Sequence, residues 1–247
     1  MKIYLAGENH NGWLNHSFFS FNRLSSFFYV SDKEVLSIHR FKRYMLDSGA
    51  FTFMGGNGGR VNWEKYVDEY ANFIKEHNID LFIEMDIDSV VGLKKVEKYR
   101  KRIEQVTGKQ PIPVLHRSRG KDYWVSILSD YKYVGVSATN KVLRSSGSSR
   151  ASLEKILPWF IALANKNNAK VHGLGYTPTR QNFPFYSVDS TAWLFGNRGG
   201  FLYKFNGKIM TKIQKPPGTR LKSREVAIHN FTEWVKYSNY MERSCIK

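Results

Sequence analysis

The stretch Tyr44-Met45-Leu46-Asp47-Ser48-Gly49-Ala50-Phe51 sets the interpretation of the whole chain. Its apolar residues predict a buried strand, and the glycine-rich segment from Gly55 to Gly59 predicts a mobile loop. A carboxylate at the end of a buried strand beside such a loop is typical of active sites in α/β enzymes. Asp47 is therefore either a functional carboxylate or a residue whose side chain caps the turn.

A second Asp-Ser step lies far along the chain, in Ser187-Val188-Asp189-Ser190. It also follows a short apolar segment that predicts a strand, over 185–189. Two such steps in similar settings favour a functional role for both aspartates over a turn-forming one.

Short apolar segments predict about eight strands, most of them separated by helical segments. The expected strands are 2–7, 44–51, 81–88, 111–117, 133–138, 170–177, 185–189 and an elaborated 201–213 with an Asn206-Gly207 turn signal. Segment 17–29 has no clean periodicity and is left unassigned. Helices are expected after Asn62 and over 90–106, 123–128 and 223–241, and from Ser152, where Pro158 is expected to break or kink the helix.

This alternation is typical of a parallel β/α fold, and the strand count and the length of 247 residues fit closure into a single (β/α)8 barrel. No linker divides the chain, so we expect one domain over 1–247, with a basic C-terminal extension from about residue 204. Alternation along 81–88 places Glu84, Asp86 and Asp88 on one face.

The charge balance is strongly basic, with 38 Lys and Arg against 21 Asp and Glu and a formal net charge of +17. Nucleic acid is the first partner this favours, an anionic membrane surface is the second, and solubility alone is the third explanation. No apolar run is long enough to span a bilayer, and the N-terminus lacks a signal-peptide pattern. The basic segment 90–106 fits a solvated helix face better than a nucleic-acid contact.

The single cysteine, Cys245, excludes an internal disulfide framework and cysteine-based zinc or iron–sulfur sites, and it fits a reducing cytoplasm. No histidine pair has the spacing of a helical metal site. We therefore expect a cytoplasmic protein without a metal or cofactor, in the host cytoplasm if a phage encodes it.

In a barrel of parallel strands, the carboxyl ends of the strands meet at one mouth. This mouth would gather Asp47, Asp86, Asp88, His116, Gly173 and Asp189. Carboxylates that crowd together perturb one another's pKa values, and such a set can divide into a nucleophile at a sugar carbon and a general acid or base. Around Gly173, glycines either admit a flat ligand to the backbone or form a tight turn. His116 by itself is more often a buried structural histidine.

Together, these motifs resemble the tRNA-guanine transglycosylase superfamily, a (β/α)8 barrel family. The resemblance rests on the order of Leu46-Asp47-Ser48-Gly49-Ala50-Phe51, Met85-Asp86-Ile87-Asp88, Val114-Leu115-His116, Gly173-Leu174-Gly175 and Ser187-Val188-Asp189-Ser190. It covers about residues 2–197 and is greatest for the short branch in phages and bacterial genomic islands that acts on DNA. The family exchanges guanine for a 7-deazaguanine such as preQ0, by attack of an aspartate on C1′.

The resemblance implies a role for each matched residue. Asp189 would be the nucleophile that forms a covalent glycosyl–enzyme intermediate, and Asp47 would bind the base and act as general acid or base. Asp86 or Asp88 would recognise the pyrimidine edge of the purine. The other residues assigned to substrate binding are His116, where the family usually has glutamine, the backbone of Gly173 and Leu174, Ser48 and Gly49.

Two departures favour the DNA branch over the tRNA enzymes. A lone Cys245 cannot supply the family's structural zinc site of three cysteines and a histidine, and the chain has no room for an appended RNA-binding domain. A flipped base requires a basic rim around the mouth. The expected rim residues follow the strands: Arg117, Arg119, Arg144, Arg150, Arg180 and Arg198.

Four functions therefore stand as alternatives. The first is a DNA-guanine transglycosylase that takes a free 7-deazaguanine base as second substrate, and the second is the same chemistry on tRNA. The third is a glycoside hydrolase, for which +17 is hard to explain. The fourth is a non-catalytic nucleic-acid-binding protein on the same barrel.

Overall fold

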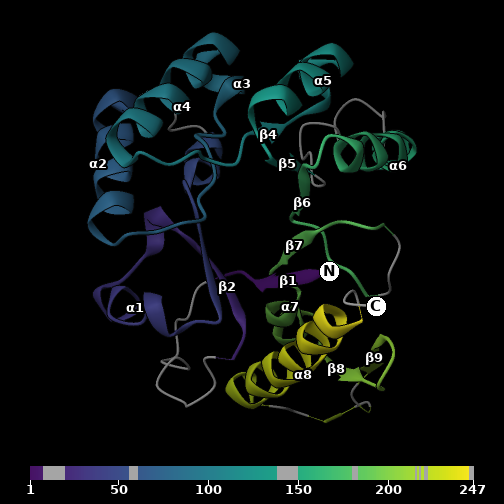
Figure 1. The fold of residues 1–247 in the computed structure, drawn as a ribbon. Coiled ribbons are helices and arrows are strands. Elements are labelled where there is room, and N and C mark those ends of the chain that lie inside the picture. Colours follow the sequence, from purple (N-terminus) through teal and green to yellow (C-terminus); the bar gives the residue numbers. More distant parts are fainter. Residues whose placement is uncertain are drawn as a thin grey trace.

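The computed structural model describes residues 1–7, 20–55, 61–137, 150–179, 183–214, 216, 218–219 and 222–244. In this part of the chain, seven parallel strands form one curled sheet, with the helices arranged around its periphery (Figure 1). The order across the sheet is β3-β2-β1-β7-β6-β5-β4. The bounds are β1 Lys2–Leu5, β2 Asn22–Ser26, β3 Arg43–Asp47, β4 Val114–Leu115, β5 Tyr133–Ser137, β6 Lys170–Leu174 and β7 Ser187–Ser190. The α/β class predicted from the sequence is confirmed.

A short bridging segment, residues 81–84, contacts both ends of this strand order. On one side it forms a parallel bridge to β3, where Ile83 N donates to Leu46 O at 2.9 Å. On the other side Ile83 forms a parallel bridge to Ile112, just before β4, and Glu84 N donates to Ile112 O at 3.0 Å. The predicted strand over 81–88 is thus reduced to isolated bridges at its start.

The prediction of an eighth barrel strand over 201–213 was wrong. These residues form a separate antiparallel hairpin of β8 (Phe201–Phe205) and β9 (Met210–Gln214). The hairpin packs on the C-terminal helix, since Tyr203 N donates to Asn230 Oδ1 at 2.7 Å. Met210 N also donates to Thr179 O at 3.1 Å, in the segment that follows β6.

The strand missing from the prediction is β2, which lies between β1 and β3. Its first four residues are buried although three of them are polar, so no hydrophobic periodicity marks the strand in the sequence. The polar groups have partners: Arg23 Nη1 donates to Leu5 O and Gly7 O, and Arg23 Nε donates to Glu34 Oε1 at 2.9 Å. Buried polar groups of this kind require such partners, and here they come from distant parts of the chain.

Two apolar clusters lie on the two faces of the curled sheet. The smaller one comprises Tyr4, Ala6, Leu24, Met45, Ile83, Ile112 and Val114, drawn from successive strands of the sheet and the bridging segment. The larger one includes Ile3, Leu5, Leu46, Val134, Val136, Val171 and Val188 together with the apolar stripes of the helices. Neighbours along a strand point to opposite faces, and the surrounding helices pack on the face of the larger cluster. The smaller cluster therefore lies on the inner, concave face.

The helices are α1 Asp32–Val35, α2 Trp63–Glu76, α3 Asp88–Val91, α4 Leu93–Thr107, α5 Lys121–Asp130, α6 Arg150–Lys166, α7 Ala192–Gly199 and α8 Ser223–Arg243. As predicted, Asn62 caps α2, because its Oδ1 accepts from Lys65 N at 3.1 Å. The predicted helix over 90–106 begins later and follows a break at Gly92, which has φ +83. Pro158 lies within a single assigned helix, so the expected break is absent from α6.

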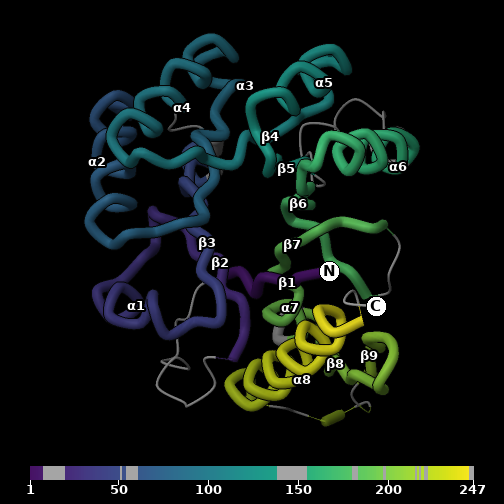
Figure 2. Tube along the Cα trace, in the orientation of Figure 1, coloured from purple at the N-terminus to yellow at the C-terminus, as the bar shows by residue number. Residues whose placement is uncertain are grey.

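The first strand and the last helix lie side by side, as the tube in Figure 2 makes visible. Ser238 Oγ on α8 donates to Ile3 O at 3.0 Å, and the Met1 amino group donates to Met241 O at 3.2 Å. None of the helices in the described ranges combines the length and the apolar character needed to cross a bilayer.

Candidate active site at the carboxyl ends of the strands

Asp47 ends β3 and is held by a turn that only glycine can complete. Gly49 has φ +73, and a Cβ at this position would lie 2.7 Å from Ser26 Oγ and 2.9 Å from the backbone nitrogen of Phe28. Ser48 is fully buried, and its carbonyl accepts from Tyr66 Oη at 2.7 Å. Ser48 and Gly49, predicted as substrate-binding residues, therefore shape the turn that presents the Asp47 carboxylate.

Asp47 lies in a strongly perturbing environment. Burial first, and then the negative charges of Asp189 and Asp86, raise the pKa of Asp47 to about 7, against the opposing backbone amides of Gly49 and Ser48. Three of the four carboxylates predicted to meet at the mouth thus interact electrostatically. Near neutral pH, Asp47 is populated in both protonation states, which suits a group that gives and takes a proton in one cycle.

Asp189 on β7 is oriented by donors from β6 and the turn after it. Its Oδ1 accepts from Gly175 N at 2.8 Å and faces His172 Nε2 at 3.2 Å. Gly175 adopts φ +63, which turns its N–H toward the carboxylate. No donor in the described ranges reaches Oδ2. Neither partner is predictable from the sequence, because no local pattern links β6 to β7.

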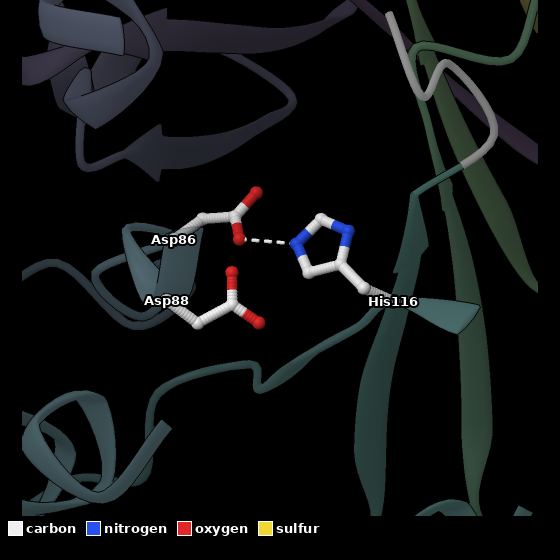
Figure 3. A group of neighbouring side chains, drawn as sticks. All are labelled: Asp86, Asp88 and His116. Atoms are coloured by element: carbon white, nitrogen blue, oxygen red, sulfur yellow. Dashed lines mark hydrogen bonds and ion pairs between the residues drawn. The ribbon is translucent and has the colours of Figure 1, made fainter. Parts of the chain in front are cut away.

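Asp86 and Asp88, which follow the bridging segment, converge with His116, the residue after β4 (Figure 3). His116 Nε2 is hydrogen-bonded to Asp86 Oδ1. Burial alone would lower the pKa of His116, but the hydrogen bond to Asp86 and the charges of Asp86 and Asp88 outweigh it and raise that pKa. The imidazolium is therefore favoured beside these carboxylates, as a hydrogen-bond donor.

These three side chains also have the composition of a cation site. Their ligand atoms lie within 4.8 Å of one another. Each carboxylate already has a cationic or donor partner, since Asp86 bonds His116 and Asp88 Oδ2 accepts from Arg119 Nε at 2.9 Å. A metal ion held by these side chains would have to replace the hydrogen bond between His116 and Asp86 and compete with Arg119 for Asp88.

Behind this group lies a buried ion-pair network centred on Glu84, which is fully buried. Its Oε2 accepts from Arg100 Nε at 2.6 Å, and its Oε1 accepts from Arg119 Nη1 at 2.9 Å and from Val114 N at 2.7 Å. Arg119 links this network to Asp88. The network fixes the segment that carries Asp86 and Asp88 against β4 and α4.

The prediction that Arg119 belongs to a phosphate-binding rim was wrong. Its side chain is only 1% exposed, because Glu84 and Asp88 hold it in the interior. The basic segment that became α4 is likewise divided. Arg100 faces inward, whereas Lys94, Lys95, Lys98, Lys101 and Arg102 are exposed. Arg100 shares a helix face with the buried Val96, Tyr99 and Ile103, and this spacing was the sequence signal for its burial.

The other predicted rim residues differ in how far the structure places them. Arg117 is exposed next to His116. Arg144 and Arg180 lie outside the described residues, as does most of the glycine-rich segment from Gly55 to Gly59. Arg150 and Arg198 are placed by their backbone alone, in α6 and α7 respectively.

The prediction that a flat ligand can approach the backbone of Gly173 was wrong for the side on which a Cβ would stand. A Cβ on Gly173 would lie 3.0 Å from Phe185 Cε2, so the ring of Phe185 already fills that space. Close packing against this ring accounts for the glycine. Leu174, by contrast, is partly exposed and packs against the inner cluster of the sheet.

Comparison with protein-family models gives no match for this chain, and comparison with curated proteins gives none either. Function is therefore inferred from the residues and their geometry.

Replacing Asp47 by asparagine should change stability in a pH-dependent way. The pKa of Asp47 is raised from 3.8 to about 7 in the folded state. Folded protein therefore binds a proton between these values that unfolded protein releases, and its free energy of unfolding falls as pH rises through about 7. Asp47→Asn removes that loss, so we expect it to be more stabilising at pH 8 than at pH 4, by up to about 4 kcal/mol at 1.36 kcal/mol per pKa unit.

Urea unfolding of wild type and variant at both pH values measures this difference. The matched control is Asp80→Asn, because the Asp80 side chain is 82% exposed and pairs with Lys109 at the surface. Its effect should be small and similar at both pH values. An Asp47→Asn effect that is the same at pH 4 and pH 8 would contradict the expectation.

Proposed function

We propose that this protein is a DNA-guanine transglycosylase, which exchanges guanine for a 7-deazaguanine base through a covalent intermediate on Asp189. The carrying observation is the electrostatic coupling of Asp47 to Asp189 and Asp86 at the carboxyl ends of parallel strands. In this proposal the fold is a (β/α)8 barrel, with the bridging segment 81–84 as the eighth strand between β3 and β4. The paired contacts of that segment with Leu46 and Ile112 support this closure.

The orientation of Asp189 supports its assignment as nucleophile. Its Oδ1 is occupied by Gly175 N and His172, so Oδ2 is the oxygen available for attack. Oδ2 donates an electron pair to C1′ while the bond between C1′ and guanine N9 breaks, and the electron pair of that bond leaves on N9. The result is a glycosyl ester of Asp189 and a free guanine.

Asp47 supplies the proton transfers in this scheme. With a pKa of about 7, its acid form protonates the departing N9, and the resulting carboxylate then removes the N9 proton of the incoming base. N9 of that base attacks C1′ and displaces the Asp189 carboxylate. Atoms and charge balance over the cycle, and Asp47 returns to its acid form.

Asp86, Asp88 and His116 are assigned to base recognition. A 7-deazaguanine offers both donors and acceptors on its pyrimidine edge, and the hydrogen-bonded pair of Asp86 and His116 presents an acceptor beside a donor. His116 is 12% exposed and Asp86 is 26% exposed, so both side chains are reached from outside while remaining largely desolvated. Desolvated polar groups discriminate strongly between bases that satisfy them and bases that do not.

A polyanionic substrate is supported by the basic region that follows β7. Between Ser190 and Glu225 the sequence has no Asp or Glu and has eight Lys or Arg: Arg198, Lys204, Lys208, Lys212, Lys215, Arg220, Lys222 and Arg224. Of these, Lys204, Lys208 and Lys212 are exposed on the β8–β9 hairpin. The bond from Met210 to Thr179 holds the hairpin to the segment after β6, which leaves the same end of the sheet as Asp47 and Asp189.

The test is exchange of labelled guanine out of duplex DNA and, separately, out of tRNA, each in the presence of 7-deazaguanine bases. We expect release of guanine from DNA that depends on the added base. Exchange in tRNA alone would replace DNA by tRNA as the substrate and keep the chemistry. Tight, salt-sensitive binding to DNA with no exchange in either substrate would overturn the proposal in favour of a binding protein.

A further inference from the structure

A buried hydrogen-bond chain runs along the inner face of the sheet and ends at Asp189. Tyr133 Oη lies 2.5 Å from Ser187 Oγ, and Ser187 Oγ lies 2.6 Å from His172 Nδ1. His172 Nε2 lies 3.2 Å from Asp189 Oδ1. His172 and Ser187 are completely buried, so no solvent competes for these groups. The chain connects β5, β6 and β7 below the mouth.

The identities of the partners limit which nitrogen of His172 carries the proton. A carboxylate oxygen can only accept, so Nε2 must carry a hydrogen to bond with ionised Asp189. Nδ1 of the neutral ring is then an acceptor for the Ser187 hydroxyl, and Ser187 Oγ in turn accepts from Tyr133. In this arrangement, every contact in the chain pairs a donor with an acceptor and no charge is added to the interior.

Aromatic side chains hold the ring in place. The rings of Tyr4 and Tyr133 meet the His172 imidazole edge-on, with centroids at 5.9 Å and 6.4 Å. These contacts restrict the orientation of the imidazole, and the acceptor oxygen of Asp189 selects the Nε2–H tautomer. The Gly175 amide is the second donor to the same oxygen of Asp189.

We propose that His172 is a positioning residue, held by Ser187 and Tyr133 in the Nε2–H tautomer that the Asp189 carboxylate requires, which occupies Oδ1 of Asp189 and directs Oδ2 toward the substrate. The positioning of a nucleophile rests on the proposed function, whereas the tautomer does not. A carboxylate held by two donors on one oxygen cannot rotate to a non-productive angle. Misplacement of a reacting group by about 1 Å costs on the order of 100-fold in rate.

The tautomer is tested by ¹⁵N NMR of histidine-labelled protein, with His172→Gln used to assign the signal. We expect a protonated Nε2 and an unprotonated Nδ1 in the wild type, and in Ser187→Ala a shifted Nδ1 signal with Nε2 still protonated, because Asp189 remains. Tyr133→Phe should perturb the Nδ1 signal less, because Ser187 remains. A protonated Nδ1 with a bare Nε2 would overturn the proposal, whether or not the protein exchanges bases.

The positioning role is tested by the split between kcat and KM in the exchange reaction. His172→Leu should lower kcat by about 100-fold or more and leave KM for the nucleic acid within about twofold. His172→Gln keeps an N–H donor near the position of Nε2 and should recover at least about tenfold of that loss. If His172→Leu and His172→Gln lose kcat equally at matched thermal stability, His172 acts only through packing and the positioning role is wrong. Absence of exchange in the wild type would overturn the proposed function and leave the tautomer result standing.

Discussion

Asp189→Asn is expected to abolish base exchange while nucleic-acid binding stays near the wild-type level. An amide oxygen is too weak a nucleophile to form the ester at C1′, so kcat should fall on the order of 10⁴-fold or more, as for other lost nucleophiles. The variant should fold normally, because the asparagine oxygen can still accept from Gly175 N. Single-turnover release of labelled guanine measures the loss.

A direct sign of the covalent step accompanies this prediction. Wild-type protein mixed with DNA in the absence of an incoming base should accumulate a protein–DNA adduct that survives denaturation, and Asp189→Asn should form none. Asp122→Asn, at an exposed position on α5, is the matched control and should behave as the wild type. Turnover retained by Asp189→Asn would assign the nucleophile elsewhere.

Glu84→Gln is expected to destabilise the fold by about 3–5 kcal/mol, the usual effect of removing one partner from a buried ion pair. Glu84 is fully buried and accepts from Arg100, Arg119 and Val114 N. Glutamine has nearly the same volume as glutamate, so the loss of stability reflects the removed charge and not a cavity. Two guanidinium groups would be left without their shared counter-charge, and the new amide group would direct hydrogens at one of them.

Chemical denaturation measures this loss, with Glu64→Gln as the control for the same substitution. Glu64 pairs with Lys95 on the surface, where its side chain is 60% exposed, and its replacement should leave the free energy of unfolding nearly unchanged. Similar effects of the two substitutions would mean that solvent or a compensating shift neutralises the arginines. Base exchange by Glu84→Gln should also fall, because Arg119 connects Glu84 to Asp88.

The sequence indicates the parts of the site that lie within single strand-to-loop units. Asp47 and Asp189 follow apolar runs and precede turn residues, so their positions at strand ends can be predicted locally. His172 and Glu84 cannot, since their roles depend on partners from other elements: Ser187 and Asp189 for one, Arg100 and Arg119 for the other. For the same reason, Arg119 in the sequence is indistinguishable from the exposed arginines around it.

The fold shows the same division between local and distant information. Strands of Val, Ile and Leu are evident from their composition, whereas β2 carries asparagine, arginine and serine in a buried position. Only the neighbours of β2 in space make that composition acceptable. The hairpin β8–β9 has a clear turn signal but no local feature that excludes it from the parallel sheet.

The place of β1 in the strand order has a consequence for how the chain acquires its structure. β1 is flanked by β2 and by β7, so Lys2 pairs with Ser187, and Trp193 donates to the carbonyl of Ala6, 187 positions earlier. During synthesis the first strand therefore remains without one neighbour until most of the polypeptide has left the ribosome. Contacts of such long sequence separation slow folding and prolong the exposure of unpaired strand edges. We therefore expect the β1 edge that pairs with β7 to stay open in nascent chains until β7 has been synthesised.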